Sequence, residues 1–156
     1  MGNKTKDVLI DWAINFIRSK DAITGILQNI EKDKEGFDIK ATHSNKEEFI
    51  IVEPFIKKSE DIINKLQKDR YITIFVMNSY ENFKFLIDNW KRLIDFQKLT
   101  IYFVNMFSHT DKKWAIKPYL HDLITNNKSL KEGLNSLFVT VEPLTEEYLE
   151  GKVYKE

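Results

Sequence analysis

Three continuous apolar runs constrain the fold of this chain more than any other feature of its sequence. They span residues 49–52, 71–77 and 99–105, and segments long enough to form helices separate them. Strands that are buried on both faces read as unbroken apolar runs, as in the centre of a parallel sheet. Strands that alternate with helices imply right-handed parallel crossovers, so the sequence predicts an α/β layer fold.

The region before these runs predicts two helices. Residues 7–18 are apolar nearly all round, and their polar residues form one narrow stripe: Asp7, Asp11, Asn15 and Arg18. Such a helix needs cover on most sides, which favours a homodimer. Asp21 is expected to cap a second helix that runs to about residue 30. Gly36 is then expected to break this helix before a strand.

A hairpin is expected to join the helices to the apolar runs. Residues 37–42 alternate between apolar and polar side chains, which is typical of a strand with one buried face. The turn HSNK follows and leads into the run that begins at Phe49. The predicted sheet is therefore mixed, with about four or five strands and helices around it.

Each remaining helix is expected to begin at a capping residue. The proposed caps are Ser59, Ser79, Ser129 (with Glu132 as its capping-box partner) and Thr145. A short extended piece is expected around residues 114–117, ahead of Pro118.

Composition indicates a single globular domain over residues 1–150 with a loose tail over 151–156. The chain has 156 residues, of which 42% are hydrophobic, and this is enough to bury a core. It contains no Cys, which excludes disulfides and thiolate metal sites. No apolar run is long enough to span a membrane, so a cytoplasmic location without membrane contact is expected.

Basic residues alternate with aromatic residues near the end of the sheet region. Lys112, Lys113 and Lys117 surround Trp114, a pattern that can bind single-stranded nucleic acid through charge and stacking. The formal net charge is zero, whereas proteins that bind phosphates usually carry a basic excess. The alternative, which we favour, is that Trp114 belongs to the core and that the lysines are solvated.

Two Asn residues follow neighbouring apolar runs. Asn78 comes after the run over 71–77, and Asn105 ends the run over 99–105. Ligands bind beyond the carboxyl ends of parallel strands, so the two residues could line a pocket for a small molecule in a Rossmann-like fold. Asn is also common in turns and caps, which is the alternative interpretation. No Gly-rich phosphate loop accompanies them.

Two acidic residues flank the hairpin. Asp38 lies near the start of one predicted strand, and Glu53 ends the next. A buried helix, a strand with an early Asp, an apolar strand ending in Glu, a helix and a further strand together resemble the PD-(D/E)XK nuclease superfamily. The resemblance covers roughly residues 7–77, with spacing most similar to that of the archaeal Holliday-junction resolvases. It implies a restriction-endonuclease-like fold in which Asp38 and Glu53 bind Mg²⁺.

The chain departs from that superfamily at one functional position. The superfamily carries a Lys two residues after the Glu, where this chain has Phe55, with Pro54 between. A Phe side chain cannot position water or stabilise charge, so catalysis is in doubt. Lys40 is a candidate replacement, because it points to the same sheet face as Asp38.

Three functions remain open from the sequence. The first is a non-catalytic domain with a nuclease-like core that acts through nucleic-acid or protein contacts. The second is an active Mg²⁺-dependent nuclease that uses Asp38, Glu53 and Lys40. The third is a Rossmann-like binder of small molecules.

Overall fold

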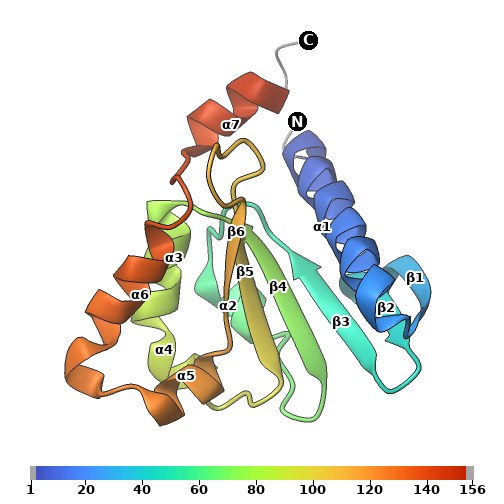
Figure 1. Cartoon of the computed structure of the whole chain (residues 1–156), viewed down its shortest axis with the longest axis horizontal. Coiled ribbons are helices and arrows are strands. Elements are labelled where there is room, and N and C mark those ends of the chain that lie inside the picture. The colour runs from blue at the N-terminus through green and yellow to red at the C-terminus, as the bar shows by residue number, and fades with distance from the viewer. Residues whose placement is uncertain (1–2, 154–156) are drawn as a thin grey trace.

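The structure is a computed structural model that describes residues 3–153, and it is built on one mixed sheet between two layers of helices (Figure 1). The sheet has six strands, in the order in which they occur in the chain. They are β1 (Leu27–Lys34), β2 (Phe37–His43), β3 (Glu47–Val52), β4 (Tyr71–Met77), β5 (Leu99–Val104) and β6 (Lys113–Ile116). The predicted α/β fold with a mixed sheet is confirmed, with six strands where about four or five were expected.

The pairing of neighbouring strands changes twice across the sheet, from antiparallel to parallel and back. β1, β2 and β3 form an antiparallel meander, β3, β4 and β5 are parallel, and β6 runs antiparallel to β5. The strand order contains no reversal of the kind at which Rossmann-like folds bind nucleotides.

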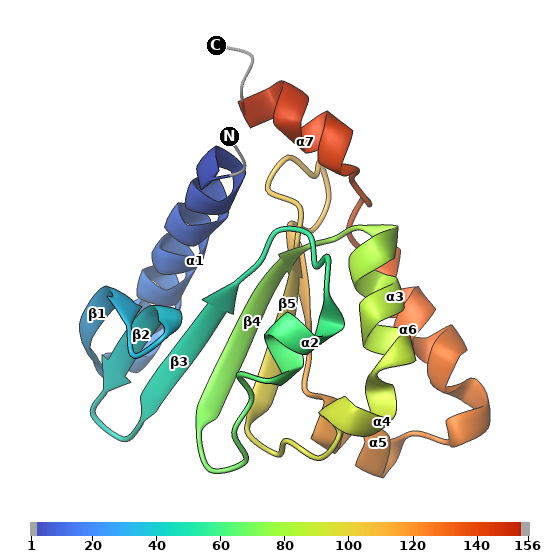
Figure 2. The ribbon, with the colours of Figure 1, turned by 180° about the vertical axis from the view of Figure 1, so that it is seen from behind.

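The helices divide between the two faces of the sheet, as Figures 1 and 2 show from opposite sides. α1 (Asn3–Thr24) and α7 (Glu146–Val153) lie on one face. The other face carries α2 (Ser59–Ile63), α3 (Tyr80–Asp88), α4 (Trp90–Leu93) and α6 (Leu130–Phe138). Both parallel crossovers advance in one direction along the sheet, so right-handed connections put their helices on the same face. α5 (Pro118–Ile124) and a 3₁₀ turn (Asn127–Ser129) join β6 to α6.

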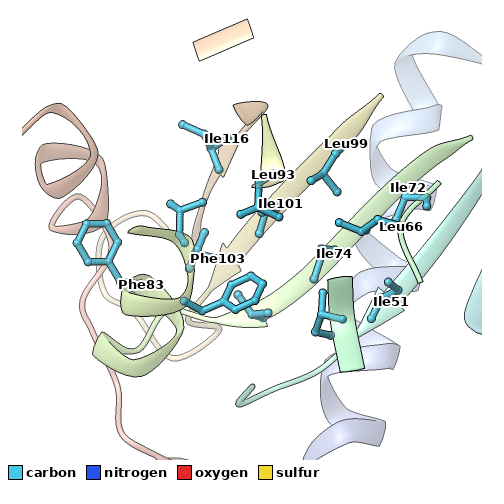
Figure 3. Packing of buried hydrophobic residues seen from close by; sticks show 14 of the residues in the cluster. Ile51, Leu66, Ile72, Ile74, Phe83, Leu93, Leu99, Ile101, Phe103 and Ile116 are labelled. Carbon is cyan, nitrogen blue, oxygen red and sulfur yellow. The ribbon is translucent and has the colours of Figure 1, made fainter. Parts of the chain in front are cut away.

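Each face of the sheet has its own apolar core. The core under α2, α3, α4 and α6 includes residues seen in Figure 3: Ile51, Ile74, Phe83, Leu93, Ile101 and Phe103. The core under α1 and α7 includes Leu9, Ile17, Ile39, Ile50, Phe75 and Leu149. The central strands supply side chains to both cores, which explains their unbroken apolar sequences.

The second helix predicted over residues 21–30 is wrong. α1 continues to Thr24, and Gly25, with a φ of 64°, ends it. The Asp21 carboxylate does not cap a new helix: it accepts hydrogen bonds from the backbone N–H groups of Ile26 and Leu27, at 2.8 and 2.6 Å. The chain then enters β1, the edge strand that adds one strand to the predicted sheet.

Gly36 also has a different role from the predicted break between a helix and a strand. Glu35 and Gly36 form the two-residue turn between β1 and β2, with φ values of 55° and 84°. Positive φ at both positions matches the right-handed twist of a hairpin, and Gly adopts it without steric cost.

Two of the four predicted helix caps are confirmed and two are wrong. Ser79 and Thr145 each accept a hydrogen bond from the backbone N–H three residues later, so these two caps are confirmed. Ser59 is the first residue of α2 and not its cap, and Ser129 makes no capping bond to α6. The helix that Ser79 caps ends at Asn89, which separates α3 from α4.

The C-terminal segment differs from the predicted loose tail. Gly151 to Val153 belong to α7, whereas residues 154–156 lie outside the described residues. Within residues 3–153, no helix is both long and apolar enough to cross a lipid bilayer.

Candidate functional site

The hairpin and α1 bring three charged residues together at one end of the sheet. β2 and β3 are antiparallel, so Asp38, near the start of β2, and Glu53, just after β3, lie at the same end. Both line an open hollow of about 460 Å³ beside α2, and Lys6 of α1 lines it with them. The sequence predicts the convergence of the two carboxylates, but it gives no sign of Lys6.

Both oxygens of the Asp38 carboxylate have partners within the protein. Oδ1 lies 2.8 Å from Nζ of Lys6, and Oδ2 accepts a hydrogen bond of 2.7 Å from the backbone N–H of Val52. The Asp38 side chain is only 13% exposed, whereas that of Lys6 is 36% exposed. The pair is thus shielded on the carboxylate side, where charge-assisted hydrogen bonds are strongest.

Glu53 occupies a less favourable environment for a charge. Burial raises its pKa above the ordinary value for Glu, and the Asp38 charge raises it further, although Lys6 acts in the opposite direction. The carboxyl group therefore holds its proton to higher pH than an exposed Glu does.

Lys6 is held in its charged form by the same cluster. Partial burial by itself would lower its pKa, but the hydrogen bond to Asp38 and the charges of Asp38 and Glu53 outweigh burial and raise it. The ammonium group thus supplies positive charge between the two carboxyl groups.

The cluster offers a divalent cation the carboxylates of Asp38 and Glu53, and Lys6 already pairs with Asp38. Hard cations take several oxygen ligands, commonly six for Mg²⁺. Each Asp38 oxygen already has a partner within the protein, and among residues 3–153 no three His, Cys, Asp or Glu side chains are grouped to hold a metal ion. The positive partner of Asp38 in this structure is the Lys6 ammonium group.

Lys40, the predicted replacement for the missing catalytic Lys, is engaged elsewhere. Its Nζ lies 2.8 Å from the Glu35 carboxylate and 3.1 Å from that of Glu47. It therefore links the β1–β2 turn to the first residue of β3. Phe55 is 7% exposed and packs in the core under α1, whereas Glu53 lines the hollow beside α2.

Asn78 and Asn105 serve as internal clamps. The buried Asn78 amide donates to the carbonyls of Phe138 and Val141, and its Oδ1 accepts a 2.8 Å hydrogen bond from Nε1 of Trp114. Asn105 donates to the Glu142 carbonyl at 2.7 Å and accepts from the backbone of Phe107. These hydrogen bonds hold the end of α6 and the segment that follows it. The amide groups of Asn78 and Asn105 are therefore bonded within the protein and do not line a polar pocket.

Trp114 and the lysines around it point in different directions. Trp114 is 5% exposed and stacks on Phe103, with ring centroids 4.4 Å apart. The Lys112 ammonium donates to the backbone carbonyls of Met106 and Ser108, and Nζ of Lys113 lies 5.1 Å from the ring centroid of Phe16. Lys117 donates to the Thr100 hydroxyl at 2.8 Å. Trp114 is thus a core residue, and its ring is not available to stack on a base.

A pH titration tests the environment of Glu53. Because its folded-state pKa is raised, protonated Glu53 stabilises the fold below the unfolded-state pKa, and this stabilisation is lost as pH rises through the folded-state value. We expect Glu53→Gln, which stays neutral, to remove this loss, as measured by urea unfolding across that pH range. Exposed Glu81→Gln is the control and should leave the pH profile unchanged. An unchanged profile for Glu53→Gln would contradict the assignment.

Comparisons with protein-family models, with curated proteins and with solved structures find no match to this chain.

Proposed function

We propose that this chain is a non-catalytic binding domain with a nuclease-like core, in which Lys6 takes the place of a divalent cation. The supporting observation is the 2.8 Å contact between Nζ of Lys6 and Oδ1 of Asp38. The domain acts through contacts with nucleic acid or protein and not through phosphodiester hydrolysis.

The order of elements is consistent with the nuclease-like part of this proposal. A helix, an antiparallel meander, a second helix and a parallel strand follow one another, with Asp38 and Glu53 on or beside neighbouring strands. The superfamily resemblance rests on the same elements and on these two residues.

Electrostatics support the non-catalytic part. A divalent cation beside Asp38 would have to displace Lys6, or remain next to its positive charge. The raised pKa of Glu53 means that a proton competes with a cation for this carboxylate to higher pH than at an exposed Glu. Phe55 supplies no charge where the superfamily has a Lys.

An active Mg²⁺-dependent nuclease is the second candidate. The observation that favours it is the convergence of Asp38, Glu53 and Lys6 in one open hollow, where Lys65 also lies. In that case Lys6 would act as the displaced catalytic Lys, and the ion pair would open when metal binds.

Metal titration separates the two candidates. We expect wild-type protein to show no Mg²⁺ or Mn²⁺ binding by calorimetry at millimolar concentration and to leave single- and double-stranded DNA and RNA intact. Lys6→Met, which frees Oδ1 of Asp38, is expected to bind Mn²⁺ detectably at millimolar concentration, where the wild type does not. Lys84→Met is the matched control, because Lys84 forms an exposed ion pair with Asp88 within α3.

Two outcomes would overturn the proposal. One is metal binding by the wild type that disappears in Asp38→Ala and Glu53→Ala. The other is metal-dependent cleavage that requires the same residues. Either result would establish the nuclease.

A homodimer through α1 is part of the same proposal. The polar stripe of α1 is exposed as predicted, but Val8, Ile10 and Trp12 are only partly buried within the chain. A second copy could cover them. Sedimentation velocity would show a concentration-dependent shift between monomer and dimer, and a monomer at all concentrations would exclude the dimer.

A further inference from the structure

A second pocket, which the acidic cluster does not explain, lies at the opposite end of the sheet. Its volume is about 320 Å³, within the range typical of small-molecule sites. The C-terminal half of α1, the β2–β3 turn, the first residues of β4 and β5, and Lys117 enclose it. In Figure 1, α1 lies to one side of β4 and β5 and leaves this face of both strands in view.

We propose that this pocket binds a small organic acid with an aromatic body and a single carboxylate or phosphate group. The site shares no residue with the Asp38 cluster, so the proposal does not depend on the proposed function.

Aromatic rings form the apolar part of the pocket. Phe75 and Tyr102 stack at 4.9 Å with an interplanar angle of 9°, and Phe16 packs edge-on against Tyr102 at 5.1 Å. All three rings line the pocket, but Phe75 is buried, so Phe16 and Tyr102 supply the accessible aromatic surface. They offer a surface for a planar ligand, which prefers offset stacking or edge-to-face contact.

The charged side chains leave the pocket with an excess of positive charge. Four lysines line it: Lys20, Lys46, Lys98 and Lys117. In the described part of the chain, none of these ammonium groups lies within ion-pair distance of a carboxylate.

The two carboxylate side chains that line the pocket, Asp21 and Glu48, already form hydrogen bonds within the protein. Asp21 accepts backbone hydrogen bonds at the end of α1. Glu48 lies 3.0 Å from Nε2 of His43 through one oxygen and accepts from the Thr73 hydroxyl through the other. Neither residue lies within ion-pair distance of the four lysines, although the Glu48 charge acts on Lys117. The four lysines outnumber the two carboxylates, so an anion from solution fits the site electrostatically.

Lys117 is the residue that an anion would stabilise most. Burial lowers its pKa, and repulsion from Lys46 and Lys20 lowers it further, although the Glu48 charge acts in the opposite direction. Its one protein partner among the described residues is neutral, the Thr100 hydroxyl at 2.8 Å. A carboxylate or phosphate beside Nζ would form a charge-assisted hydrogen bond in a partly desolvated position, where such bonds are strong.

His43 indicates that the ligand also carries a hydrogen-bond donor. Its Nδ1 is buried and has no hydrogen-bond partner, and the side chain lines the pocket. With Nε2–H donated to the Glu48 carboxylate, Nδ1 is an acceptor. A ligand hydroxyl or N–H group would satisfy it.

Matched acids and amides test the proposal. The probes are 4-hydroxyphenylacetate, indole-3-acetate and phenyl phosphate, with 4-hydroxyphenylacetamide and indole-3-acetamide as neutral counterparts. We expect at least one acid to bind with a submillimolar to millimolar Kd by ligand-observed NMR and calorimetry, and to raise Tm. Its amide should bind at least about tenfold more weakly, because one charge-assisted contact is lost.

Two variants locate the binding. Lys117→Met and Lys46→Met should each reduce affinity for the acid by about tenfold or more, whereas Lys84→Met, far from the pocket, should not change it. The second variant covers the case in which loss of Lys117 disturbs the fold.

Three results would overturn the proposal. The first is equal binding of acids and amides, which would leave only apolar contact. The second is no binding of any acid at millimolar concentration. The third is binding of a short thymidine oligonucleotide, but of no acid, with loss of that binding in Lys117→Met, which would make the lysines a nucleic-acid surface.

Discussion

Replacing Asn78 by Ala is expected to lower the free energy of unfolding by about 3–5 kcal/mol. The substitution leaves three buried groups without a partner: Nε1–H of Trp114 and the carbonyls of Phe138 and Val141. Each unsatisfied buried group costs on the order of 1–3 kcal/mol, and partial relaxation reduces the sum. Urea unfolding followed by circular dichroism measures the change.

Asn135→Ala is the matched control for this variant. Asn135 is exposed on α6, so the same substitution should change the free energy of unfolding by less than about 0.5 kcal/mol. A loss below about 1 kcal/mol for Asn78→Ala would mean that Asn78 is not a structural clamp. The predicted ligand pocket at this strand end would then regain support.

Trp114→Ala should produce a loss of similar size for a different reason. The ring is buried, stacks on Phe103 and meets Phe83 edge-on at 6.4 Å, so its removal opens a cavity in the core. Truncation of a buried Trp costs about 3–5 kcal/mol. Trp114→Phe keeps most of the packing and removes the hydrogen bond to Asn78, so about 1–3 kcal/mol is expected.

The two substitutions are expected to be non-additive. Asn78 and Trp114 share one hydrogen bond, and directly coupled residues show interaction energies of about 0.5–3 kcal/mol in double-mutant cycles. The Asn78→Ala, Trp114→Ala double variant should therefore lose less than the sum of the single losses. A near-neutral Trp114→Ala variant would instead indicate a surface residue, as the nucleic-acid interpretation of this Trp requires.

The central strands were predictable because a strand that is buried on both faces has an unbroken run of apolar residues. β4 has the bounds that its apolar run indicates. β1 was missed because an edge strand carries few apolar residues, and those between 23 and 30 also fit a helical period. Ile23, which that period placed on an inner face, is 91% exposed. Gly25 was the overlooked signal for the end of α1.

The candidate sites were only partly predictable. Asp38 and Glu53 could be placed together because antiparallel neighbours bring the start of one strand beside the end of the next. Lys6 reaches them from a helix that crosses the sheet, and no local spacing rule predicts that crossing. The pocket around Lys117 draws its residues from several elements, so no single stretch of sequence marks it.

The strand order of the sheet bears on how the chain is made. Each strand pairs with the one that precedes it in the chain, and no later strand is inserted between two earlier neighbours. During synthesis from the N-terminus, the sheet can therefore grow by adding each strand to one open edge as it leaves the ribosome. Early strands need no partner that has yet to be translated, which shortens the time for which their edges are exposed to aggregation. The Asn78 clamp is completed only after α6 emerges, so it locks a sheet that is already assembled.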